Sequence, residues 1–67
     1  MHYIVTETTN PFAPRQLGTF EADAAALREI NAIDATAYVA EDPDTPDHYD
    51  LITKTGRIFT IEPTAAH

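Results

Sequence analysis

Seven carboxylates and not one lysine or arginine lie between Arg28 and Lys54. Five of the seven fall in the single stretch from residue 41 to residue 50. The formal net charge of the chain is −7, and charges of one sign gathered in one part of a small protein bear on association more than on fold. These candidate partner-binding residues are Glu29, Asp34, Glu41, Asp42, Asp44, Asp47 and Asp50.

Four of these carboxylates recur at every third position, with a proline in each of the first two intervals. Proline favours the polyproline II conformation, which has three residues per turn and rises about 3.1 Å per residue. The spacing therefore predicts a row of carboxylates along one edge of the segment, at steps of roughly 9 Å. The row would consist of Glu41, Asp44, Asp47 and Asp50.

Three interpretations of this acidic segment remain open at the level of sequence. The first is a solvated surface loop whose charge keeps the protein soluble. The second is a carboxylate row that meets a groove lined by lysine and arginine, in place of nucleic-acid phosphates; the absence of basic residues favours it, because ordinary surfaces mix both signs. The third is an irregular calcium site, which lacks the glycine of a helix-loop-helix calcium loop and has prolines at ligand positions.

Catalytic chemistry finds little support in the sequence. His48 and Tyr49 beside two aspartates could indicate acid–base chemistry, but a single histidine in an acidic loop is more often a solvated side chain. The chain contains no serine or cysteine to act as a nucleophile and no glycine-rich phosphate loop. The three histidines show no metal-ligand spacing. We therefore expect no enzyme activity, no cofactor and no metal.

Length and composition bound the class of protein. The 67 residues predict a single domain over residues 1–67, and a chain of this size buries only roughly 60% of its unfolded surface. The absence of cysteine excludes disulfides and thiolate metal sites. The acidic balance argues against direct binding of nucleic acid or of a membrane. With no signal peptide and no long apolar run, a cytoplasmic protein is expected.

The first part of the chain is predicted to form a strand over residues 2–8, a loop over residues 9–18 and a helix over residues 21–33. Two prolines interrupt the strand pattern in the loop, where we expect Phe12 to fill a gap under the sheet edge. Residues 17–20 either add a short strand or lead into the helix. Ala26, Ile30 and Ile33 share one helical face, and Thr19 or Glu21 could cap the start.

The second part is predicted to form a strand over residues 36–40, the acidic proline-containing loop over residues 41–48, a hairpin of residues 49–54 and 57–62, and a frayed tail over residues 63–67. Pro63 is expected to end the last strand. A type I turn with Gly56 in a left-handed bulge position gives the hairpin one coherent apolar face. That face consists of Tyr49, Leu51, Phe59 and Ile61.

The fold class expected from these elements is α+β, with a single amphipathic helix packed on a small, mostly antiparallel sheet in β-α-β-β order. One helix covers one sheet face only. Ile52 and Ile58 are expected to pair on the opposite face, which makes that open face a candidate contact or dimer surface.

The chain resembles the small acidic anti-CRISPR proteins that bacteriophages encode against host defences. The resemblance is one of profile: 67 residues, no cysteine, strong acidity, a starting Met-x-Tyr-Ile-Val strand and one helix on a compact sheet. These proteins share no common motif, so no residue role is transferred. The resemblance implies action in the cytoplasm of a bacterial host and occlusion of the basic DNA-reading channel of an RNA-guided nuclease complex, a DNA mimic in effect.

The function predicted from the sequence is therefore that of a non-enzymatic inhibitor. Its carboxylates would bind a protein partner with a lysine- and arginine-rich nucleic-acid-binding groove, as in a bacterial defence complex, and block recognition of target DNA. The alternative is a small adaptor or dimerisation module that binds through the open sheet face around Ile52 and Ile58. The expected oligomeric state is a monomer or a weak homodimer.

Overall fold

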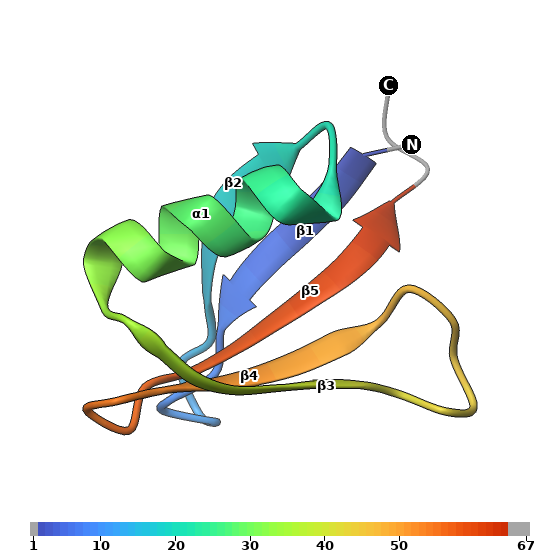
Figure 1. Ribbon diagram of the computed structural model, residues 1–67. Coiled ribbons are helices and arrows are strands. Elements are labelled where there is room, and N and C mark those ends of the chain that lie inside the picture. Colours follow the sequence, from blue (N-terminus) through green and yellow to red (C-terminus); the bar gives the residue numbers. More distant parts are fainter. Residues whose placement is uncertain (1, 65–67) are drawn as a thin grey trace.

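The computed structural model describes residues 2–64 and contains one helix lying across a five-stranded sheet (Figure 1). The strands follow the order β2-β1-β5-β4-β3 in the sheet, and every neighbouring pair is antiparallel. The α+β class is confirmed. The elements are β1 (His2–Glu7), β2 (Arg15–Phe20), α1 (Asp23–Ile33), β3 (Thr36–Glu41), β4 (Tyr49–Thr53) and β5 (Ile58–Thr64).

The expected β-α-β-β order is wrong, because the chain follows the order β-β-α-β-β-β. The predicted loop over residues 9–18 contains the first four of the six residues of β2, an edge strand that pairs with β1. A bulge in this pairing leaves Leu17 as the extra residue between Gln16 and Gly18. The bulge breaks the alternation of apolar and polar positions by which a strand is recognised, so the sequence pattern indicated only a possible short strand over residues 17–20, which is the second part of β2.

Phe12 does not fill a gap under the sheet, since its side chain is 94% exposed. It lies in the turn between β1 and β2, which Asn10 closes: the Asn10 side-chain oxygen accepts from the Phe12 N–H at 3.0 Å, and its carbonyl accepts from the Ala13 N–H at 3.0 Å. This turn follows the end of β1 and precedes β2. Phe12 therefore has no sheet face to cover.

The helix begins two residues later than predicted and is not capped by Thr19 or Glu21. Ala22 occupies the N-cap position with no side-chain hydrogen bond, while the Asp23 carboxylate accepts from the Ala24 N–H at 2.7 Å. Ala26 and Ile30 are fully buried, as predicted, but Ile33 is 44% exposed because it is the last residue of the helix.

No helix in residues 2–64 is long and apolar enough to cross a membrane.

The core lies between α1 and one face of the sheet. Burying a valine, leucine, isoleucine or phenylalanine side chain stabilises a fold by about 1.5–3 kcal/mol relative to leaving it in water. Half-buried Tyr3, Leu17, Phe20, Leu27 and Tyr49 pack around the core. The fully buried apolar residues are Val5, Ala26, Ile30, Leu51, Phe59 and Ile61.

The predicted register of the β4–β5 hairpin is confirmed: Leu51 pairs with Phe59, and Tyr49 pairs with Ile61. The Gly56 N–H donates to the Thr53 carbonyl at 3.0 Å, and Gly56 has φ of +92°. This conformation is the left-handed one that the turn requires. The hairpin thus directs Tyr49, Leu51, Phe59 and Ile61 to the helix side.

Pro63 does not end the last strand, because β5 continues to Thr64. Pro63 pairs with Tyr3 of β1, whereas the pairing of β5 with β4 stops at Ile61. At this point β5 has a neighbour on one side only, which is where a sheet tolerates proline. The predicted frayed tail is therefore strand at residues 63 and 64, and its remainder lies outside the described residues.

Replacing Gly56 by alanine should destabilise the protein by about 1 kcal/mol or more, because an L-residue strains the left-handed conformation. No heavy atom lies within 4 Å of the added methyl group, so the effect reports backbone conformation and not a clash. Urea unfolding measures it. Gly56→Asn is the control and should lose less, since asparagine tolerates this conformation better; equal losses would contradict the assignment.

Candidate functional site

The acidic loop between β3 and β4 is built from two successive turns. The Thr45 N–H donates to the Asp42 carbonyl at 3.3 Å, and the His48 N–H donates to the Thr45 carbonyl at 3.2 Å. The Asp42 N–H closes the loop on the His48 carbonyl at 2.8 Å. Polyproline II has no internal hydrogen bonds of this kind, so the predicted extended segment is wrong.

Two carboxylates of the loop bind its own backbone. Asp42 accepts from the Asp44 N–H at 2.9 Å, and Glu41 accepts from the Asp47 N–H at 3.0 Å. Asp47 has φ of +66°, a left-handed conformation that aspartate adopts more readily than most residues. These bonds hold the loop in one shape and leave the exposed Asp44 and Asp50 as its most available carboxylates.

The predicted row along one edge is not formed, because its end members lie on opposite faces of the sheet. Glu41 pairs with Tyr49 and Ala40 pairs with Asp50. Successive residues of a strand point to opposite faces, so Glu41 shares the helix side with Leu51 while Asp50 shares the open side with Ile52. Carboxylates therefore lie on both faces of the sheet at the end where β3 finishes and β4 begins.

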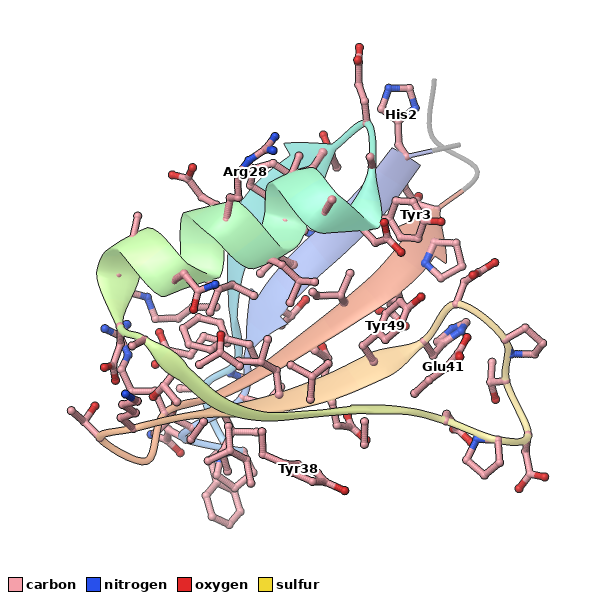
Figure 2. All side chains as sticks on the ribbon, viewed as in Figure 1. His2, Tyr3, Arg28, Tyr38, Glu41 and Tyr49 are labelled. Carbon is pink, nitrogen blue, oxygen red and sulfur yellow. The ribbon has the colours of Figure 1, made fainter. Side chains whose placement is uncertain are left out.

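On the helix side, three carboxylates gather around the Tyr49 phenol. The Tyr49 hydroxyl donates to Asp23 at the start of α1, at 3.1 Å, and Figure 2 shows Tyr49 and Tyr3 on this side of the sheet. Removal from water, the bond to Asp23 and the charges of Glu41 and Asp47 raise the pKa of Tyr49 to about 12. Tyr49 therefore stays protonated and ties the hairpin to the helix.

On the open side, a small hollow of about 170 Å³ lies beside the loop and has an acidic lining. The His48 Nε2 atom lies 3.7 Å from a Glu62 carboxylate oxygen, and its Nδ1 atom lies 3.1 Å from the Pro46 carbonyl oxygen. No group of three or more metal-binding side chains in the part of the chain that the structure describes is arranged to hold a metal ion. The lining residues are Asp42, His48, Tyr49, Asp50, Thr60, Ile61 and Glu62.

The structure brings five of the seven candidate residues together and separates the other two from them. Glu29 lies exposed on the helix, and Asp34 lies at its carboxyl end. Asp34 accepts hydrogen bonds from the Thr55 hydroxyl and, at 3.4 Å, from the Thr55 N–H. A hydrogen bond from the Thr53 side chain, followed by these bonds from Thr55, lowers the pKa of Asp34. These partners give Asp34 a structural role at the opposite end of the sheet from the acidic loop.

Three carboxylates that the sequence analysis did not select join the acidic loop at the same end. Glu21 and Asp23 precede and begin the helix, and Glu62 lies in β5 one residue beyond Ile61, the partner of Tyr49. The predicted hairpin register could have placed Glu62 there, but no sequence signal joins Asp23 to Tyr49. This acidic end contains eight of the eleven carboxylates: Glu21, Asp23, Glu41, Asp42, Asp44, Asp47, Asp50 and Glu62.

Three of the four basic residues lie at the other end of the sheet. The carboxylates at that end, Glu7 and Asp34, have hydrogen-bond partners. Arg57 binds Glu7 through two bonds of 2.9 and 2.8 Å and lies 5.5 Å from the centre of the Phe59 ring. The Arg57 hydrogen bonds lower the pKa of Glu7 to about 2. Arg15 pairs with Glu7 across β1 and β2, and Lys54 follows β4. The molecule therefore has a separation of charge along its strands.

The open face carries an apolar row across three strands. Ile52 pairs with Ile58, as predicted, and also with Tyr38 on the other side. The three side chains are 44%, 38% and 62% exposed, respectively, and Figure 2 shows Tyr38 pointing away from the helix. The open face thus has an exposed apolar surface at its β3 side.

The chain matches no family model, no curated protein and no solved structure. The separation of charge, the internal hydrogen bonds of the acidic loop and the exposed apolar row are therefore the observations that bear on its function.

Replacing Glu7 by glutamine should reduce the acid sensitivity of the fold. The folded pKa of Glu7 is depressed to about 2, so its stabilising contribution is present above the ordinary carboxyl pKa and is lost as pH falls from about 4.5 towards 2. Glutamine does not titrate. The free energy of unfolding should therefore differ less between about pH 5 and pH 3 in Glu7→Gln than in the wild type.

Urea unfolding at the two pH values measures this difference, and Glu29→Gln is the matched control. Glu29 is exposed on the helix, so its replacement should leave the wild-type pH dependence in place. An unchanged pH dependence in Glu7→Gln would contradict the assigned role of the Glu7–Arg57 pair.

Proposed function

We propose that the protein is a non-enzymatic inhibitor whose acidic end binds a basic nucleic-acid-binding surface of another protein. The separation of charge carries this proposal: the acidic end has eight carboxylates and, within the described residues, no lysine or arginine. Such an end attracts a positively charged groove and repels nucleic acid. It would occupy the groove in place of phosphates.

The shape of the acidic end favours a groove or channel over a flat surface. The loop between β3 and β4 projects beyond the end of the sheet (Figure 1). The carboxylates at its base lie on both faces of the sheet, with Glu41 at the end of β3 on the helix side and Asp50 in β4 on the open side. A projection that is acidic on both sides can meet basic residues on two facing walls. Complementary charge of this kind steers association and increases its rate.

The hydrogen bonds inside the loop support the same function. Glu41 and Asp42 hold the backbone of the loop, and Tyr49 ties its base to Asp23. A binding segment that is already ordered loses less conformational entropy on association than a flexible one. The free-energy cost of bringing its carboxylates together is also part of folding, so it does not have to be overcome again when a partner binds.

The partner class in this proposal is a bacterial defence complex that reads DNA through a basic channel, the class to which the anti-CRISPR resemblance points. The inhibitor would act by occlusion in the cytoplasm of the host, with no catalytic residue and no cofactor. Its contact residues would be Glu41, Asp42, Asp44, Asp47 and Asp50, and Glu29 and Asp34 would contribute only to the wider field.

A second candidate function is that of an adaptor binding through the open sheet face. The exposed row of Tyr38, Ile52 and Ile58 favours it. Salt separates the two candidates, because an apolar contact holds or tightens at high salt, whereas a contact between carboxylates and basic residues weakens.

The tagged protein should capture a basic nucleic-acid-binding protein from bacterial lysate in about 50 mM NaCl and release it in about 500 mM NaCl. Duplex DNA should compete for the captured protein. Asp44→Lys and Asp50→Lys should each lower the affinity about tenfold or more at low salt, since each replaces an attraction with a repulsion. Mass spectrometry and a binding titration measure these outcomes.

Glu29→Lys is the matched control, because it makes the same charge change at an exposed site outside the acidic end. It should weaken binding much less than either loop variant. Equal losses in all three would mean that net charge alone determines binding. Capture that resists salt, or that survives Asp44→Lys with Asp50→Lys, would contradict the proposed contact.

A further inference from the structure

One edge of the sheet is open to pairing. β3 is the last strand in the order β2-β1-β5-β4-β3, so the side of β3 that faces away from β4 has no neighbouring strand within residues 2–64. The Asn31 side chain accepts from the Thr36 N–H at 2.8 Å and satisfies the start of this edge. The part beyond the bulge at Ala37 is regular and runs from Tyr38 to Glu41. An uncovered edge of this kind is a template for another strand.

The exposed apolar side chains of the protein concentrate around this edge. Tyr38, in β3, and Ile52, in the neighbouring β4, lie on its open side. Val39 pairs with Leu51 on the helix side and is 40% exposed, and Ile33, which ends the helix three residues before β3, is 44% exposed. Of the large apolar residues that are exposed, Phe12 lies elsewhere, and Ile58 lies two strands away in β5. A strand added to β3 would cover apolar surface on both sides of the sheet.

The other edge of the sheet has different properties. β2 begins with the charged Arg15, contains the bulge at Leu17 and includes Gly18. A charge, a bulge and a glycine in an edge strand all oppose the addition of another strand. β3 also has a bulge, at Ala37, and ends in the charged Glu41, but its regular part from Tyr38 to Ala40 has no charge, and the strand has no proline or glycine. The two edges are therefore not equivalent, and β3 is the one suited to pairing.

We propose that β3 pairs with β3 of a second copy, antiparallel about a twofold axis, to form a continuous ten-stranded sheet. Residues that face each other in an antiparallel pair lie on the same side of the sheet. A register centred on Val39 satisfies this rule: Val39 lies opposite Val39 of the second copy, and Tyr38 lies opposite Ala40. Each large tyrosine then meets a small alanine.

The charges of the chain fit this arrangement. Antiparallel pairing sends the two acidic loops to opposite ends of the joint sheet, which limits their repulsion. It also brings the acidic loop of each copy to the end of β3 where Lys54 lies in the other copy, since the Lys54 N–H donates to the Ala35 carbonyl at 2.8 Å. Lys54 of each copy therefore faces the acidic loop of the other, next to Asp34, whose carboxylate is already bound by Thr55. A parallel arrangement would put the two loops side by side.

Sedimentation equilibrium between about 5 µM and about 500 µM should show a reversible monomer–dimer equilibrium for the wild type. Val39→Lys should raise the dissociation constant about tenfold or more, because like charges directly opposite each other destabilise a strand pair. Ile58→Lys is the matched control: it makes the same substitution at a site of similar exposure, 38% against 40%, but two strands from the edge. It should dimerise as the wild type does.

Cross-linking gives a second readout that does not depend on a destabilising charge. The natural chain has no cysteine, so Val39→Cys introduces a single thiol. Residues opposite each other in an antiparallel pair have Cα atoms about 4.5–5.5 Å apart, which suits a disulfide. Oxidation should convert Val39→Cys to a covalent dimer and leave Ile58→Cys monomeric.

A wild type that remains monomeric over the whole concentration range would overturn the proposal. So would dimerisation that Ile58→Lys abolishes and Val39→Lys spares, because that pattern requires stacking of the open faces. Neither result bears on the acidic end, so the proposed inhibitor function can fail or hold independently.

Discussion

The register of the β4–β5 hairpin is the constraint on which the rest of the structure depends. Pairing Leu51 with Phe59 puts both side chains, together with Ile61, under the helix. A shift by one residue would send this set to the opposite face and leave α1 without a core to cover. The same register puts Ile52 and Ile58 on the open face and sets Glu62 beside the acidic loop. Gly56 therefore helps to determine the core, the exposed face and the acidic end together.

The carboxylates at the two ends of the sheet have different kinds of partner. At one end Glu7 is bound by Arg57, and Asp34 is bound by Thr55. At the other end the carboxylates have hydroxyl and backbone N–H donors as partners and no lysine or arginine within the described residues. Self-repulsion there opposes folding, and the apolar core must offset it. This unpaired charge is the feature on which the proposed binding to a basic surface rests.

The sequence predicted those features that local chemistry determines. The helix, the hairpin and its register followed from residue types, the apolar period and Gly56. The strand β2 followed only in part, as a possible short strand over residues 17–20, because the bulge at Leu17 breaks its alternation. The acidic loop was misread because proline suits turns as well as polyproline II, and no local pattern indicates that Glu41 and Asp42 accept from the loop backbone. The bond between Tyr49 and Asp23 joins residues 26 positions apart, and one sequence alone contains no signal for it.

The pairing of β1 with β5 has a consequence for how the chain reaches this structure. Residues 2–7 are joined to residues 59–64, and β5 lies at the centre of the sheet although it is the last strand in the sequence. The earlier elements cannot complete the sheet until β5 has been synthesised. Contacts between residues so far apart slow folding, because closing the long loop costs entropy before it yields stabilising contacts. The protein should therefore fold in one cooperative step that requires β5, with no stable half-formed stage.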